Sequence, residues 1–200
     1  MVAMDYVTVA GFTELTEVIK GSRFIAWAAP VAAEDEAQAL LDSARAAHPD
    51  ATHHCSAWRL GETVRFSDDG EPGGTAGRPM LEVLLRRDLQ YAAVIVIRYY
   101  GGTKLGAGGL VRAYSGSAAK ALDAAGTREV LEQGSLRLTV PFALVDSVIR
   151  FVADVPAVRT TASEYTAEGL ELDLEMPVGQ VAGLRQQLTD HTRDELLFRD

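Results

Sequence analysis

The fold is decided by the stretch YAAVIVIRYYGGTKLGAGGLVRAY, residues 91–114. Its first half is an apolar, β-branched run, which is typical of a central β-strand. Five glycines follow between positions 101 and 109, and Leu110, Val111 and Tyr114 then recur at helical spacing. The stretch therefore predicts a strand, a glycine-rich turn and a helix that we expect to end at Gly126.

Patterns before this stretch predict further elements of the same domain. A strand-like alternation opens the chain, FIAWAAPV (24–31) predicts a buried strand, and residues 32–50 predict an amphipathic helix. Two strands flank Gly61-Glu62, a pair that suits a two-residue type II′ hairpin loop. Pro79 fits the first turn of another helix.

The pattern restarts after TREVLEQG, residues 127–134. A strand, a helix, two strands and another helix follow, and LLFR (196–199) offers a closing strand. In GLELDLEMP (169–177) apolar residues alternate with acids, which predicts a sheet with one solvent-exposed face. We therefore predict an α+β protein with two domains, residues 1–130 and 135–200, the second of them ferredoxin-like with its helices on one face of an antiparallel sheet.

Composition is that of a soluble globular protein, with a formal net charge of -9. No apolar run approaches the ~20 residues that cross a bilayer. A single cysteine, Cys55, fits a reducing compartment, so we expect a cytoplasmic protein without a membrane partner. Residues 59–112 nevertheless carry a net charge of +2, and a cationic surface on an acidic protein favours selective contact with anions.

The glycine-rich turn is the strongest candidate for such contact. Unpaired backbone amides at a helix start attract anions, and glycines let an anion approach them. Arg98, Lys104 and Arg112 bracket the turn. The spacing is neither that of a P-loop nor that of a dinucleotide fingerprint. The rival interpretation is a tight strand-to-helix turn whose glycines serve only close packing.

A second unusual stretch, FSDDGEPGGTAGRP (66–79), contains three acids. Asp68, Asp69 and Glu71 have the oxygens that a hard cation prefers, although the spacing is not that of an EF-hand. Acids beside glycine and proline more often cap turns through the backbone, and ion pairs to Arg78 or Arg98 are a third interpretation.

The segment HHC (53–55) lies on the first strand of the predicted hairpin. Its register places Cys55 opposite Asp68 and His54 opposite Asp69. A catalytic thiolate or a zinc site is conceivable there. A packed or hydrogen-bonded wall is favoured, because a neighbouring carboxylate raises a thiol pKa.

Four blocks in this order resemble the IMPACT (YigZ) family, over roughly residues 18–125. They are KGSRF (20–24), HHCSAWRLG (53–61), FSDDGEPGGTAGRPML (66–81) and VIVIRYYGGTKLGAGGLVRAYSGSAAKAL (94–122). The resemblance implies an N-terminal domain like the second domain of ribosomal protein S-five, with a four-stranded sheet and helices on one face. It implies a C-terminal domain like the last domain of EF-G.

The resemblance points to binding more than to chemistry. Eukaryotic members damp a translational stress response by competing for the activator of an initiation-factor kinase; we do not expect that role here, because it uses an additional N-terminal domain. Both implied folds recur in ribosome-associated and RNA-binding proteins. We therefore predict a regulatory, translation-associated protein that contacts RNA or the translation machinery, with a protein partner possible for the C-terminal domain.

The alternative is an enzyme that acts on a nucleotide or a phosphorylated small molecule. No catalytic residue, metal or cofactor is predicted. Trp58, Tyr99 and Tyr100 are candidates for stacking on bases. The candidate anion or nucleic-acid contacts are Arg78, Arg98, Tyr99, Gly101, Gly102, Lys104, Gly106, Gly108, Gly109 and Arg112, with Asp68, Asp69 and Glu71 as motif acids.

Overall fold

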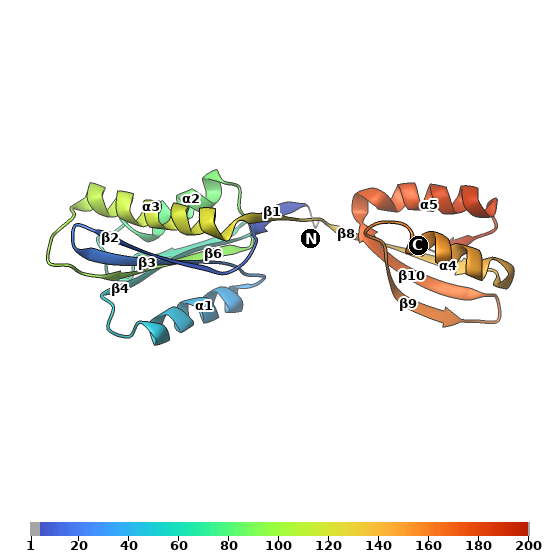
Figure 1. The fold of residues 1–200 in the computed structure, drawn as a ribbon, viewed down its shortest axis with the longest axis horizontal. Helices are drawn as coiled ribbons and strands as arrows, with labels where there is room; N and C mark the ends of the chain where they lie inside the picture. Colours follow the sequence, from blue (N-terminus) through green and yellow to red (C-terminus); the bar gives the residue numbers. More distant parts are fainter. Residues whose placement is uncertain (1–4, 200) are drawn as a thin grey trace. The chain divides into compact units, whose positions relative to one another are not determined.

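A computed structural model describes residues 5–199 of the 200-residue chain and divides it into two compact units (Figure 1). One unit is Tyr6–Val130, and the other joins Asp5 to the residues from Leu131 onward. No helix within residues 5–199 combines the length and hydropathy needed to cross a membrane.

The first unit is built on an antiparallel sheet, which in the described residues has five strands in the order β2-β3-β6-β4-β5. The apolar run of the opening stretch is β6, and the prediction of a central strand is confirmed. The strands are β2 (Thr13–Ile19), β3 (Ser22–Pro30), β4 (His53–Leu60), β5 (Thr63–Ser67) and β6 (Ala92–Tyr99).

Three helices of the described chain cover both faces of this sheet (Figure 1). Phe24 of β3 packs on one face beneath α2 (Gly77–Arg86) and α3 (Ala107–Ala125). Its neighbour Ile25 packs on the opposite face against α1 (Glu34–Ala47). The expected four-stranded sheet with helices on one face is therefore wrong. Strands β3 and β6 are apolar on both faces, so both faces require cover.

Local predictions for the unit are confirmed. Leu60 pairs with Thr63, which leaves a two-residue hairpin loop, and only its first residue, Gly61, has a positive φ (59°). That is the requirement of a type II′ turn. The helix after the glycine-rich turn ends at Gly126. Residues 127–130 form β7 (Thr127–Val130), which pairs with β1 (Tyr6–Val9) and belongs to this unit.

The second unit has the strand order β11-β8-β10-β9, with all neighbours antiparallel. This βαββαβ order is that of the ferredoxin-like arrangement. Its elements are β8 (Gln133–Val140), the 3₁₀ helix η1 (Phe142–Leu144), α4 (Val145–Ala153), β9 (Arg159–Tyr165), β10 (Leu170–Pro177), α5 (Val178–Thr192) and β11 (Leu197–Arg199).

Strand β10 confirms the prediction of a sheet with one exposed face. Leu172 and Leu174 are buried with α4 and α5, whereas Asp173, between them, forms an ion pair with Arg137 of β8 at 2.6 Å. The hydrogen bond from Arg137 holds the pKa of the Asp173 carboxyl below its usual value. The alternation therefore separates a hydrophobic core from a face of ion pairs.

Candidate anion-binding site

The glycine-rich turn links the end of β6 at Tyr99 to the start of α3 at Ala107. A Cβ atom at Gly101 would lie 2.0 Å from the backbone of Gly21, so only glycine allows this close approach. Gly102 and Gly106 have φ values of 83° and 73°, which favour glycine, and open space surrounds them. Close packing therefore explains Gly101, while Gly102 and Gly106 set the path of an exposed turn.

The N-terminus of α3 is open to a ligand. Its N-cap residue is Gly106, and no side chain accepts a hydrogen bond from its first amides. A hollow of about 170 Å³ adjoins this helix end and is lined by Lys20, Leu105, Gly109 and Arg112, among others. We call residues 100–109, together with Lys20 and Arg112, the basic turn.

The cations of the basic turn have no carboxylate partners among the described residues. Lys20, Lys104 and Arg112 all lie outside the ion pairs of residues 5–199, whereas most other arginines of the first unit are paired. Three free cations around unpaired helix amides form a site suited to a phosphate or a carboxylate.

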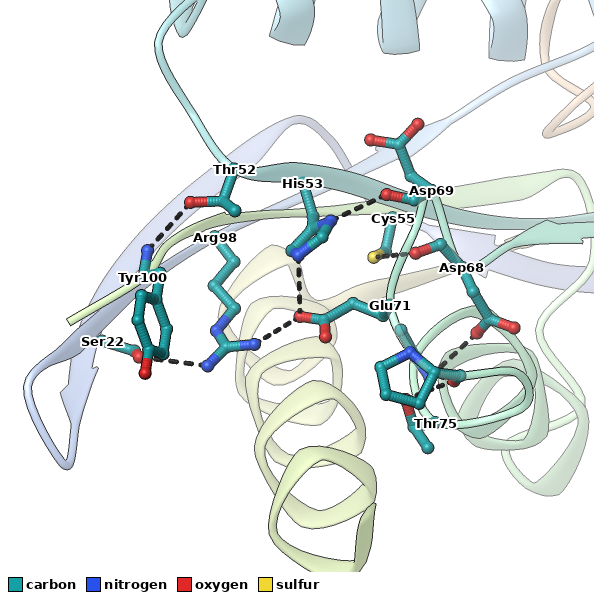
Figure 2. A network of polar contacts seen from close by, with 12 residues as sticks. Ser22, Thr52, His53, Cys55, Asp68, Asp69, Glu71, Thr75, Arg98 and Tyr100 are labelled. Carbon is teal, nitrogen blue, oxygen red and sulfur yellow. Dashed lines mark hydrogen bonds and ion pairs between the residues drawn. The ribbon is translucent and has the colours of Figure 1, made fainter. Parts of the chain in front are cut away.

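Arg98 is not one of these free cations. It lies next to the turn in the sequence, but its side chain is only 6% exposed and donates to Oε1 of Glu71 at 2.6 Å (Figure 2). Its Nη2 donates to Ser22 Oγ at 3.2 Å. A charge within an apolar, buried strand requires such a partner, because burial without one is costly.

Glu71 is the centre of this buried network. Besides Arg98, Tyr114 of α3 donates its hydroxyl to Oε1 of Glu71 at 2.7 Å. His53 Nε2 lies 3.7 Å from the same oxygen, and His53 Nδ1 is bonded to the Asp69 carbonyl at 2.8 Å (Figure 2). The network thus joins β4, β6, α3 and the loop 68–76. The interpretation of Glu71 as an ion-pair partner of Arg98 is confirmed.

Asp68 and Asp69 organise the backbone around them. The Asp68 carboxylate accepts hydrogen bonds from the amides of Gly74, Ala76 and Gly77, at 2.7 to 3.0 Å, and so stabilises the start of α2. Asp69 accepts from the His54 amide at 2.6 Å. The turn-capping interpretation is confirmed for Asp68, whereas the Asp69 carboxylate joins the loop to strand β4. No group of three potential metal ligands occurs among the described residues.

Cys55 forms part of a packed wall. Its thiol is fully buried and donates to the Asp68 carbonyl at 3.0 Å. Burial raises the pKa of Cys55 far above its usual value, and nearby Glu71 adds to the increase. A protonated, buried thiol is a poor nucleophile and a poor metal ligand, so the structure favours the packing interpretation over catalysis or zinc.

The aromatic candidates differ in availability. Trp58 is buried, and the ring of Tyr99 is covered by Arg23 at 4.1 Å while its hydroxyl is bonded to His48. Tyr100 is 48% exposed at the start of the turn. Of the three rings proposed to stack on bases, Tyr100 is therefore the one that a ligand can reach.

Arg78, a candidate from the sequence, lies apart from the basic turn, whereas Lys20 and Ser22 adjoin it. Arg78 pairs with Glu82 on its own helix, and no hydrogen bond or ion pair in residues 5–199 links it to the turn. Lys20 and Ser22 were not singled out from the sequence, although both lie in the KGSRF block. The signal that would have found them is the β3–β6 pairing, which sets Phe24 beside Arg98.

Comparisons with known proteins point to one family. The model of the Impact N-terminal domain matches residues 20–122. The chain is 44% identical over 181 residues to the "IMPACT family member in pol 5'region" of Thermus thermophilus, covering 90% of this chain and 98% of that protein. It is 37% identical over 187 residues to IMPACT family member YigZ of Escherichia coli, covering 91% of each.

A solved structure also matches over nearly the whole length. It is a crystal structure described as that of a hypothetical protein, 34% identical, with a TM-score of 0.69. The match covers 98% of this chain and 97% of that chain.

Proposed function

This chain belongs to the IMPACT family, and we propose that it is a translation-associated, regulatory binding protein that contacts RNA phosphates through its basic turn. The link to translation comes from the family resemblance. As part of the proposal, the first unit is an analogue of the second domain of ribosomal protein S-five and the second unit an analogue of the last domain of EF-G. Because one fold can carry many functions, the proposed function is argued from the residues of the site.

The observation that supports the proposal most is the set of free cations at the start of α3. Lys20 and Arg112 line the hollow at this helix end, and Lys104 lies in the turn just before it. None of the three forms an ion pair in the described chain, and the first amides of α3 have no side-chain cap. A phosphate at this point would accept hydrogen bonds from amides and from charged side chains together.

RNA fits this surface better than a free anion because an aromatic ring adjoins the cations. Tyr100, the first residue of the basic turn, is exposed and can stack on an unpaired base while the cations bind the backbone. The acidic remainder of the protein repels a polyanion elsewhere, which confines contact to the basic turn.

The enzyme alternative has no observation in its favour. It requires acids that are free to hold a metal or to act as a base, and both Asp68 and Glu71 are engaged in structural contacts. A second alternative is that the chain binds a protein partner and not RNA. Association with that partner would survive RNase treatment, whereas association through RNA would not.

The experiment is a titration of a fluorescent, unpaired RNA oligonucleotide at several salt concentrations. Since the slope of log K against log salt is about −0.7 per phosphate contact in single strands, Lys104→Ala/Arg112→Ala should flatten it by roughly 1.4. The matched control is Arg86→Ala/Arg128→Ala, which removes the same charge from the C-terminal end of α2 and from β7. Equal slopes for both double variants, or no binding by the wild type, would refute the proposal.

A further inference from the structure

We infer that Ser22 and Glu71, two buried residues that cannot touch a ligand, position the basic turn for anion binding. The inference rests on the proposed function, since it concerns the same site. It concerns how the site keeps its shape rather than what the site binds.

The turn itself has few anchors. Residues 102–104 are exposed, and open space surrounds Gly102. At its β6 end the Tyr100 amide donates to Thr52 Oγ1 at 3.0 Å, and the Gly101 amide donates to Ser22 Oγ at 3.1 Å. Two hydroxyl groups therefore hold the point where the chain leaves the sheet.

The Ser22 hydroxyl connects the turn to the buried network (Figure 2). Its oxygen accepts from the Gly101 amide and from Arg98 Nη2, and a hydroxyl oxygen has the two lone pairs that both donors need. Ser22 is fully buried, so its hydroxyl is unavailable to RNA.

Glu71 fixes the other end of this chain of contacts. At 2.6 Å its carboxylate orients the guanidinium of Arg98, which in turn contacts Ser22. Glu71 is held by the Tyr114 hydroxyl from α3, the helix whose first turn forms the anion site. One set of buried contacts thus links both sides of the basic turn, the Gly101 backbone and α3.

The ion pair between Arg98 and Glu71 also determines which cations contact the ligand. Because Glu71 already neutralises the charge of Arg98, this arginine does not draw the anion into the core, and ligand contact stays with the exposed cations. The affinity of the site then depends on the turn's geometry, which Ser22 transmits, and not on the charge of Arg98.

The test compares Ser22→Ala with Thr8→Val in the full chain, using the same RNA titration. Thr8 is also a buried hydroxyl with one hydrogen bond, to the Tyr91 carbonyl at the opposite end of β6. Ser22→Ala should raise Kd roughly tenfold, the equivalent of about one hydrogen bond, with an unchanged salt slope because every cation remains. Thr8→Val should bind as the wild type does.

Two further measurements keep the inference falsifiable if Ser22→Ala folds poorly. Glu71→Gln keeps the side-chain shape and should also raise Kd without changing the slope. Hydrogen exchange of the Gly101 amide should be faster in both variants, while amides in the middle of β6 keep their protection. An altered slope would mean that a ligand contact has been lost, which contradicts a positioning role.

The outcomes separate the two proposals. If the wild type binds RNA and Ser22→Ala binds as Thr8→Val does, positioning is refuted and the proposed function stands. If the wild type does not bind, both are refuted. The inference is supported if Ser22→Ala and Glu71→Gln both bind RNA more weakly than the wild type, if Thr8→Val does not, and if the Gly101 amide exchanges faster in the first two variants.

Discussion

Two glycines should respond to the same substitution in opposite ways. At Gly101 a Cβ atom would lie 2.0 Å from the Gly21 backbone, so Gly101→Ala forces a backbone shift. We expect it to lower the free energy of unfolding by about 1–3 kcal/mol, as overpacking does. Gly116 lies inside α3 with open space around it, so Gly116→Ala should raise stability by about 0.5–1 kcal/mol. Urea unfolding measures both; equal effects would contradict the close contact.

His54 should make stability depend on pH. Burial lowers its pKa, against smaller opposing effects of its bond to the His48 carbonyl and of the charge of Asp69. Its unfolded pKa is about 6.5, so between the two values the unfolded chain binds more protons, and stability falls as pH falls through this window. We expect Tm to fall from about pH 7.5 to about pH 5.5, and to fall less in His54→Gln. An equal fall in both proteins would exclude His54 as a cause.

Single residues differ in how far their contacts could be predicted from the sequence. The hairpin register predicted that His54 would lie opposite Asp69, and the structure joins the His54 amide to the Asp69 carboxylate. Arg98 was a candidate anion contact because it brackets the glycine-rich turn, and an ion pair with the motif acids was the other interpretation. The structure shows that ion pair with Glu71, 27 positions away on a loop, and local patterns alone did not decide between the two.

Among the elements, α2 depends on an acid that lies outside it. Asp68 accepts from the amides of Ala76 and Gly77 at the start of this helix and of Gly74 in the loop before it. Asp68→Asn replaces one acceptor oxygen with a donor that faces an amide, so we expect a loss of about 1–3 kcal/mol in the free energy of unfolding. The control is Asp50→Asn, an exposed acid with the same change of charge. Faster exchange of the Gly74–Gly77 amides should accompany the loss; protection as in the wild type would contradict the capping role.

The strands and helices themselves were largely predictable, because their signals are local. The apolar run of β6, the alternation in β10 and the stop at Gly126 all have short-range causes. Cover on both faces of the first sheet was missed, since it depends on α1 packing against β3, which precedes it, and against β6, which follows it much later in the chain. The residues of β3 contained that information, because Phe24 and Ile25 are both apolar on opposite faces.

At the scale of the whole molecule, we expect the first unit to bind RNA and the second unit not to contribute to binding. The second unit carries six basic against twelve acidic residues from position 131 onward, so it should repel RNA. We expect the segment 1–130 to keep RNA affinity within about threefold of the full chain, because the basic turn lies entirely within it. A fall of tenfold or more in the segment, measured by the same titration with its fold verified by circular dichroism, would show that the second unit contributes to binding.

The most direct test of the central claim is an NMR titration of ¹⁵N-labelled full-length protein with an unpaired RNA oligonucleotide. The account predicts that the earliest and largest shifts occur at the amides of residues 106–109, with Tyr100 and Lys104 close behind, and that they weaken in Lys104→Ala/Arg112→Ala. Saturable shifts confined to other surfaces, with residues 100–109 unchanged, would contradict it.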